Sequence, residues 1–191
     1  VCSSDLVVFD VRESYNSAIA KTFQHFAGYE INQQEINEIK NQGGMNCDWD
    51  AVQCLLLNHN IKVEYIDIIN IFQELFYNPN NNTKEYLIDK EKLIISKEIF
   101  EELSKTYDMV VFSGRLKEEA IYSLKKFEID KYFSYFVTCD DLPKNMLKPH
   151  PQGVLNILQH CPFKTIKYFG DSVDDIIAGN KANVETIGDR K

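Results

Sequence analysis

The chain has 191 residues, of which 44% are hydrophobic and 26% charged, a size that suits one globular domain or a core domain with an insertion. Its net charge is −8 and its 21 Lys and Arg residues form no basic stripe, which disfavours a nucleic-acid-binding or anionic-membrane-binding surface. Its five cysteines include no CxxC pair, and no apolar run reaches membrane-spanning length, so we expect reduced thiols in a cytoplasmic protein.

The first six residues, Val1–Leu6, resemble the translation of a sequencing adapter more than natural protein. The alternative is an ordinary polar tail. We base no fold prediction on this segment. A short apolar run, Val7–Phe9, follows it and ends at Asp10.

The first half of the chain places apolar residues at helical spacing and predicts an almost purely helical region. The predicted helices cover residues 14–26, 33–40, 48–59 and 65–76, and a further helix starts after Ser96. A loop with two glycines separates the second helix from the third. Such a loop is a candidate for ligand binding.

The second half alternates short β-rich runs with helical patterns. Strands are predicted at 109–112, 133–138, 166–169 and 184–187, with helices at 116–127, 151–159 and 174–181 between them. This alternation predicts an α/β fold with a doubly wound parallel sheet, in which ligands bind at the carboxyl ends of the strands.

Polar residues follow the first two of these strands. Ser113-Gly114-Arg115 comes directly after the first, and a hydroxyl with the N–H groups of a glycine turn can hold a phosphate, although Ser-Gly is also an ordinary turn. Lys148 comes after the second, within Lys-Pro-His-Pro, where the prolines stiffen the backbone and fix where the lysine points. Because the strand ends meet at one edge of the sheet, we expect these groups to converge.

An acidic turn, Gly170-Asp171-Ser172-Val173-Asp174-Asp175, follows the third strand. Carboxylates at the end of a buried strand are costly unless a cation or a reacting group neutralises them. Oxygen ligands of this kind suit Mg²⁺, which takes one or two carboxylates and completes its shell with water and phosphate. The alternative is an acidic helix N-terminus, since Ser172 and Asp174 are both good caps.

A serine, a lysine and a paired acid in this order resemble motifs II, III and IV of the haloacid dehalogenase superfamily. The matching residues are Ser113 in Val-Val-Phe-Ser-Gly-Arg, Lys148 in Lys-Pro-His-Pro, and Asp171 with Asp175 in the acidic turn. The resemblance implies that Ser113 and Lys148 are catalytic, that Ser113, Gly114 and Lys148 bind phosphate, and that Asp171 and Asp175 bind a Mg²⁺ cofactor.

The resemblance also implies a Rossmann-like core with a C1-type helical cap. Residues 1–13 would be an N-terminal remnant of the core, 14–105 the cap and 106–191 the remaining core. The loop from Gly43 to Trp49 would face the substrate, with Asn46, Asp48 and Trp49 as candidate contacts. A helix cap and a buried tryptophan explain these three residues equally well.

Motif I of the family supplies an aspartate nucleophile and an acid-base aspartate in the pattern Asp-x-Asp-Gly, which this sequence lacks. In one register, Val7–Phe9 is the first strand of the sheet, Asp10 is the nucleophile and Arg12 replaces the acid. In the other, which we favour, Asp10 matches an aspartate that family members carry a few residues after motif I. Ser3 and Asp5 then stand at the motif I positions, and the nucleophile lay upstream of this chain.

The resemblance therefore implies a Mg²⁺-dependent phosphatase that acts on a small phosphomonoester through an aspartyl-phosphate, here as a fragment without its nucleophile and a poor catalyst. A phosphomutase or dehalogenase of the same superfamily is one alternative, and an inactive binding module is another. A response-regulator receiver would place its acid pair first and its lysine last, the reverse of this order. The implied partner is a small phosphorylated metabolite.

Overall fold

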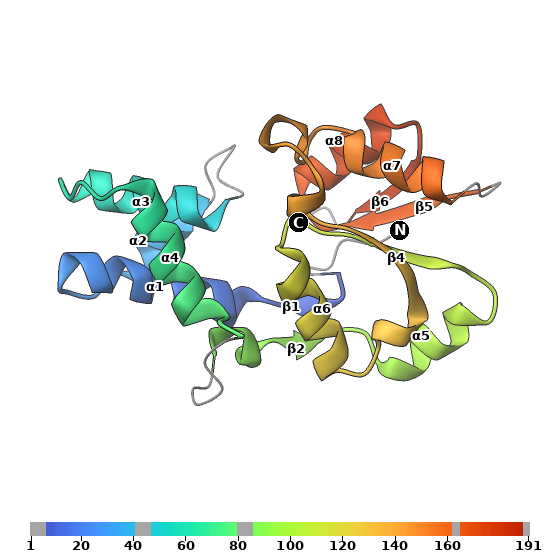
Figure 1. Ribbon diagram of the computed structural model, residues 1–191, viewed down its shortest axis with the longest axis horizontal. Helices are drawn as coiled ribbons and strands as arrows, with labels where there is room; N and C mark the ends of the chain where they lie inside the picture. Colours follow the sequence, from blue (N-terminus) through green and yellow to red (C-terminus); the bar gives the residue numbers. More distant parts are fainter. Residues whose placement is uncertain (1–6, 41–46, 80–85, 162–164, 189–191) are drawn as a thin grey trace. The chain divides into compact units, whose positions relative to one another are not determined.

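The computed structural model describes residues 7–40, 47–79, 86–161 and 165–188. The chain forms two compact units (Figure 1). One unit combines the residues up to Asp10 with those from Lys92 onward, and the other is Val11–Glu91. The chain therefore passes from one unit to the other twice, after Asp10 and after Glu91.

The unit from Val11 to Glu91 is helical. Its elements are α1 (Arg12–Ala27), α2 (Gln33–Lys40), α3 (Asp48–Asn58), α4 (Tyr65–Phe76) and the 3₁₀ helix η1 (Leu87–Lys90). Helix α1 packs against α3 and α4, and it ends at Gly28, whose φ of 79° is a left-handed conformation that glycine adopts without strain. The buried apolar faces include Ala18, Ile19, Phe23, Ile36, Ile39, Val52, Leu55, Leu56, Ile68, Phe72 and Phe76.

The other unit holds the strands that the structure describes. A short antiparallel pair joins β1 (Phe9–Asp10) to β2 (Lys92–Leu93). Two parallel pairs join β3 (Met109–Phe112) to β4 (Phe133–Val137) and β5 (Lys167–Gly170) to β6 (Glu185–Gly188). The helices of this unit are α5 (Lys97–Ser104), α6 (Lys117–Lys126), α7 (Gln152–His160) and α8 (Val173–Lys181), with short 3₁₀ turns at Asp130–Tyr132, Cys139–Asp141 and Lys144–Met146.

Helices α7 and α8 lie side by side against the parallel strands (Figure 1). Glycines let them approach closely: a Cβ at Gly153 of α7 would lie 2.2 Å from the ring of Phe112, and one at Gly179 of α8 would lie 2.1 Å from Oγ1 of Thr186. The rings of Phe112 on β3 and Tyr168 on β5 are 6.1 Å apart, so the core is continuous between the two parallel pairs.

The predicted α/β fold with parallel strands and a helical first half is confirmed, and β3 has the predicted bounds. The division of the chain differs from the one expected, because residues 92–105 belong with the strands rather than with the helical unit. The reason is pairing and packing: β2 pairs with β1, and Phe100 of α5 packs against Phe133 of β4.

The helices that the structure describes include none that is both long and apolar enough to cross a membrane. The described cysteines, Cys47, Cys54, Cys139 and Cys161, are free thiols.

Candidate functional site

Lys148 precedes α7 and reaches across the carboxyl end of a strand. Its Nζ donates to the backbone oxygen of Phe112, the last residue of β3, at 3.0 Å. The same nitrogen lies 2.7 Å from Oδ1 of Asp175, in the first turn of α8. The two side chains are 13% and 2% exposed, so this ion pair is almost withdrawn from water. Lys148 thus joins the end of β3 to the start of α8.

Two aromatic rings also lie close to the Lys148 ammonium. Its Nζ is 4.5 Å from the ring centroid of Phe112 and 6.0 Å from that of Tyr168. Ring faces attract cations, and the attraction is stronger where water is excluded. The positive charge is therefore held by a carboxylate, a carbonyl and two rings together.

Asp175 accepts hydrogen bonds at both of its oxygens. Oδ1 accepts from the hydroxyl of Tyr168 as well as from Lys148, and Oδ2 accepts from the hydroxyl and the N–H of Ser172 at 2.8 and 3.2 Å. Burial alone would raise the pKa of Asp175, but the Lys148 charge and the hydrogen bonds from Lys148, Tyr168 and Ser172 hold it below its usual range. The carboxylate is ionised at neutral pH.

Ser172 caps α8. Its Oγ accepts from the N–H of Asp175 at 3.1 Å, and the Asp175 carboxylate accepts from the N–H of Ser172 in return, which completes a capping box. Of the two caps that the sequence allowed, the structure uses Ser172 and not Asp174.

Ser113 follows β3 and is 1% exposed. Its N–H donates to the oxygen of Val137, the last residue of β4, at 2.9 Å, and its Oγ accepts from the N–H of Arg115 at 3.1 Å. Gly114 is exposed, and a Cβ there would meet no atom within 4 Å. The Ser113 hydroxyl is therefore held inside the turn, while the open space lies at Gly114. Phosphate binding by these two residues stays a prediction.

Arg115 is turned into the protein, where it is 3% exposed. Its Nη1 donates to Oγ of Ser123 on α6 at 3.1 Å, and its guanidinium lies 5.7 Å from the ring centroid of Phe9 on β1. These contacts give Arg115 a structural role beneath the turn.

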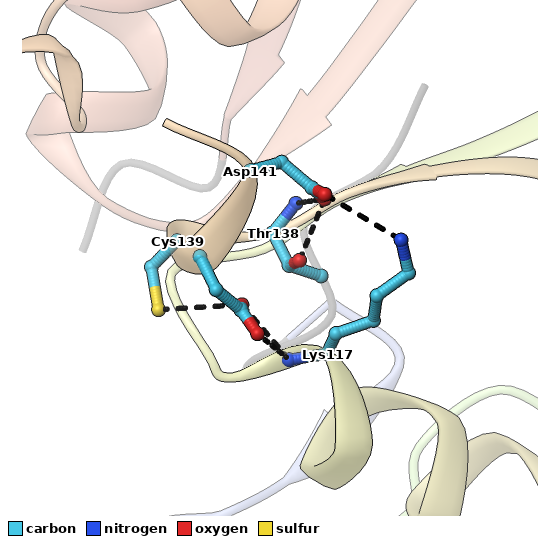
Figure 2. A network of polar contacts seen from close by, with 5 residues as sticks. Lys117, Thr138, Cys139 and Asp141 are labelled. Carbon is cyan, nitrogen blue, oxygen red and sulfur yellow. Dashed lines mark hydrogen bonds and ion pairs between the residues drawn. The ribbon is translucent and has the colours of Figure 1, made fainter. Parts of the chain in front are cut away.

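A carboxylate pair after β4, which was not predicted from the sequence, fixes the start of α6 (Figure 2). Both oxygens of Asp140 accept from the N–H of Lys117, at 3.0 and 3.2 Å. Asp141 accepts from the N–H and hydroxyl of Thr138 at 2.9 and 2.8 Å, and it lies 3.4 Å from Nζ of Lys117. The Thr-x-x-Asp spacing from Thr138, typical of a capping box, was the signal that could have revealed the role of Asp141.

Asp171 follows the last residue of β5 and is half-buried, as is Asp174 in the first turn of α8. Burial, together with the neighbouring Asp175 carboxylate, raises the pKa of Asp174. Negative charge is thus crowded at this strand end, a condition that a bound cation would relieve. Asp171 suits a Mg²⁺ whose other ligands are water and phosphate oxygens.

Asp175 has a different set of contacts from those expected of a metal ligand, because lysine, tyrosine and serine donors occupy its oxygens. Among the described side chains, no three or more His, Cys, Asp or Glu residues gather into a metal cluster. The metal-binding roles of Asp171 and Asp175 both stay predictions, and the contacts favour Asp171.

Two of the three candidate substrate contacts, Asp48 and Trp49, belong to the described part of the helical unit. Asn46 lies outside the described residues. Asp48 begins α3 and forms an ion pair with Lys40 at 2.6 Å, and Trp49 beside it is half-buried. The structure therefore shows a salt bridge at the start of α3, and substrate contact by these residues stays a prediction.

Asp10 lies in β1, where it stands opposite Lys92 in an antiparallel pair. Among the strand pairs that the structure describes, the one that contains Asp10 is antiparallel, whereas Ser113 follows a strand of a parallel pair. Ser3 and Asp5, which stand at the motif I positions in the favoured register, lie outside the described residues.

Comparison with known proteins identifies the family to which the chain belongs. The family model described as haloacid dehalogenase-like hydrolase matches residues 5–188. The chain is 29% identical over 191 residues to an imidazoleglycerol-phosphate dehydratase from Phytophthora nicotianae, covering 96% of this chain and 41% of that protein. It is 28% identical over 112 residues to the pyrophosphatase PpaX of Bacillus mycoides, covering 56% of this chain and 50% of that protein.

The chain thus spans half or less of the length of these curated relatives. Among solved structures, phosphatase Tt82 from Thermococcus thioreducens has a TM-score of 0.80 at 18% identity, covering 100% of this chain and 92% of that one. A likeness at this identity supports the fold. The family model, which extends over nearly the whole chain, shows that this protein belongs to the haloacid dehalogenase-like hydrolases.

Proposed function

We propose that the whole protein is a Mg²⁺-dependent phosphatase that acts on a small phosphomonoester. The observation that carries the proposal is the position of Lys148, whose ammonium contacts the last carbonyl of β3 next to Ser113 and pairs with Asp175 on α8. A cation, a hydroxyl and a carboxylate cluster thus lie near strand ends, where ligands bind in doubly wound folds. The printed names of the pyrophosphatase PpaX and the phosphatase Tt82 agree with hydrolysis of a phosphoryl group, although a pyrophosphatase acts on an anhydride rather than a monoester.

Each of these groups has a role in binding a phosphoryl group. The Ser113 hydroxyl and the N–H of Gly114 would donate to its oxygens, and Lys148 would neutralise the charge that gathers on them during transfer. Asp171 would hold Mg²⁺, which supplies additional positive charge at the same oxygens. Asp175 would keep Lys148 in place.

The superfamily reaction begins with an aspartate carboxylate. A carboxylate oxygen forms a bond to phosphorus as the ester P–O bond breaks, and water then hydrolyses the aspartyl-phosphate to release phosphate. We propose that Asp10 is not this nucleophile. The antiparallel pairing of β1 with β2 supports this view, because Asp10 then lies outside the parallel strands.

Hydrolysis of p-nitrophenyl phosphate by the whole protein in the presence of Mg²⁺ tests the proposal. Lys148→Ala should lower kcat/KM by about 100-fold or more, since charge stabilisation at a transferring group has effects of this order. Asp10→Asn should leave kcat/KM within about threefold of the wild-type value, because removing a group that makes no interaction with the transition state has little effect on kcat/KM. Lys181→Ala, at an exposed lysine at the end of α8, is the matched control.

Abolition of turnover by Asp10→Asn would show that the other register of motif I is correct. An absence of turnover together with retained phosphate binding would instead identify a binding module. Equal activity of Lys148→Ala and the wild type would contradict the proposed site.

A further inference from the structure

Tyr168 on β5 touches both members of the Lys148–Asp175 pair. Its hydroxyl donates to Oδ1 of Asp175, the same oxygen that lies 2.7 Å from Nζ of Lys148. Its ring centroid is 6.0 Å from that nitrogen. A buried tyrosine hydroxyl needs some acceptor, and here the acceptor is the oxygen that holds the lysine.

Packing fixes the Tyr168 ring. The side chain is 0% exposed, and the ring of Phe112 lies 6.1 Å away. On another side is Gly179 of α8, where an added Cβ would lie 3.0 Å from Cδ1 of Tyr168. The hydroxyl is therefore a donor at a fixed point.

The two groups that this donor restrains are mobile by nature. The terminal torsion of an aspartate has a broad, roughly two-fold profile, and a lysine ammonium sits on a flexible four-carbon stem. Ser172 donates to Oδ2 of Asp175 through its hydroxyl at 2.8 Å and its N–H at 3.2 Å, and it makes no contact with Oδ1 among these bonds. On Oδ1 the other donor is the flexible Lys148 itself, so the Tyr168 hydroxyl is the donor there that packing fixes. It restrains the carboxylate on the side that faces the Lys148 ammonium.

We infer that Tyr168 is a positioning residue for the phosphoryl-transfer site, which acts by holding Asp175 so that Lys148 stays aimed at the end of β3. The inference rests on the proposed function. Phenylalanine at position 168 would fill the same space and keep the ring face next to Lys148, but it would remove the donor. Tyr168→Phe therefore isolates the hydroxyl.

Binding of inorganic phosphate with Mg²⁺, followed by titration calorimetry, gives the first test. Tyr168→Phe should weaken phosphate binding by about tenfold, a fraction of what a hydrogen bond to a charged group contributes. Tyr135→Phe is the matched control, because Tyr135 on β4 packs by its ring on His160, with centroids 3.8 Å apart, and should bind as the wild type does. Lys148→Ala should lose binding.

The Lys148 side chain supplies a readout that a merely structural role would not change. NMR of protein with ¹³C-labelled lysine reports on the ε-methylene of Lys148. Its signal is assigned from its loss in Lys148→Arg, and the nearby rings should shift it from the usual lysine position. Tyr168→Phe should move this signal and reduce the shift caused by phosphate. If the Tyr168 hydroxyl has only a structural role, Tyr168→Phe should lower the urea midpoint but leave the Lys148 signal and the phosphate affinity unchanged.

The outcomes separate this inference from the proposed function. Wild-type phosphate binding by Lys148→Ala would overturn the proposed function itself. Loss of binding in Lys148→Ala, with wild-type affinity and an unmoved lysine signal in Tyr168→Phe, would overturn only the role of Tyr168. If Tyr168→Phe fails to fold, the contact can be tested in the wild-type protein by NMR. The Tyr168 hydroxyl proton should exchange slowly and lie close to the Lys148 ε-methylene. The absence of such a proton would contradict the inference.

Discussion

The Nζ atom of Lys148 lies 2.7 Å from Oδ1 of Asp175, in an ion pair whose side chains are 13% and 2% exposed. The pair links the segment before α7 to the first turn of α8, and it lies beside the last carbonyl of β3. Withdrawing two charges from water is costly, so the net stabilisation by such a pair is small. Removing one partner, by contrast, leaves the other charge buried without compensation.

Lys148→Met should therefore lower the free energy of unfolding by about 3 kcal/mol, the range seen when a buried pair loses one member. Lys148→Met combined with Asp175→Asn should be more stable than Lys148→Met alone, because no lone charge is left. Urea denaturation at pH 7 measures both. A double variant no more stable than the single one would show that Asp175 is not paired in this way.

Gly153→Ala should destabilise the protein by about 1–3 kcal/mol, the usual cost of overpacking a core. An added Cβ would lie 2.2 Å from the ring of Phe112, so α7 would have to move away from β3. Gly114→Ala is the matched comparison, because its Cβ meets no atom within 4 Å and the unfolding midpoint should barely change. Equal midpoints for the two variants would rule out the close packing of α7 on β3.

Asp140→Ala should cost about 1 kcal/mol of stability, as expected for the loss of a side-chain cap at a helix N-terminus. Its carboxylate accepts from the N–H of Lys117, at the start of α6. Asp140→Asn keeps an acceptor and should retain most of the stability. Thermal unfolding of the two variants beside the wild type makes the measurement, and a loss as large in Asp140→Asn would point to charge rather than capping.

Ionisation of Asp141 should make the stability of the protein fall with pH in the acidic range. Burial would raise its pKa, but hydrogen bonds from Thr138 and the charge of Lys117 outweigh burial and lower it. A depressed pKa means that the contribution is full above the unfolded value of about 4 and is lost as pH falls through the lower folded value. Urea midpoints between pH 5 and pH 2.5 should fall more steeply for the wild type than for Asp141→Asn. Urea midpoints that fall equally with pH in the wild type and in Asp141→Asn would contradict this role of Asp141.

Much of the core unit could be predicted because its signals are local. The apolar run of β3 and the turn at Ser113 depend on neighbours in sequence, and the structure has the strand and the turn where they were expected. Phosphate binding by Ser113 stays a prediction. The role of Asp175 could not be predicted in this way. Its spacing from Asp171 is compatible with a shared metal, and only the fold brings Lys148 and Tyr168 to its oxygen.

The boundary between the units escaped prediction for a similar reason. Helix α5 continues the helical pattern of the first half, so periodicity alone groups it with the helices before it. Its place is decided by the packing of Phe100 on Phe133 and by the pairing of Lys92 with Asp10. Contacts between residues far apart in sequence leave no periodic trace.

Lys148, Ser113 and Asp171 form the proposed Mg²⁺-dependent phosphate site, and the Mg²⁺ dependence of phosphate affinity tests this site most directly. Calorimetric titration of the wild type should show binding that tightens at least tenfold when Mg²⁺ is present, about 1.4 kcal/mol. Asp171→Asn should bind phosphate with little response to Mg²⁺. A wild-type affinity that does not change with Mg²⁺, or an Asp171→Asn variant that responds as the wild type does, would contradict the account.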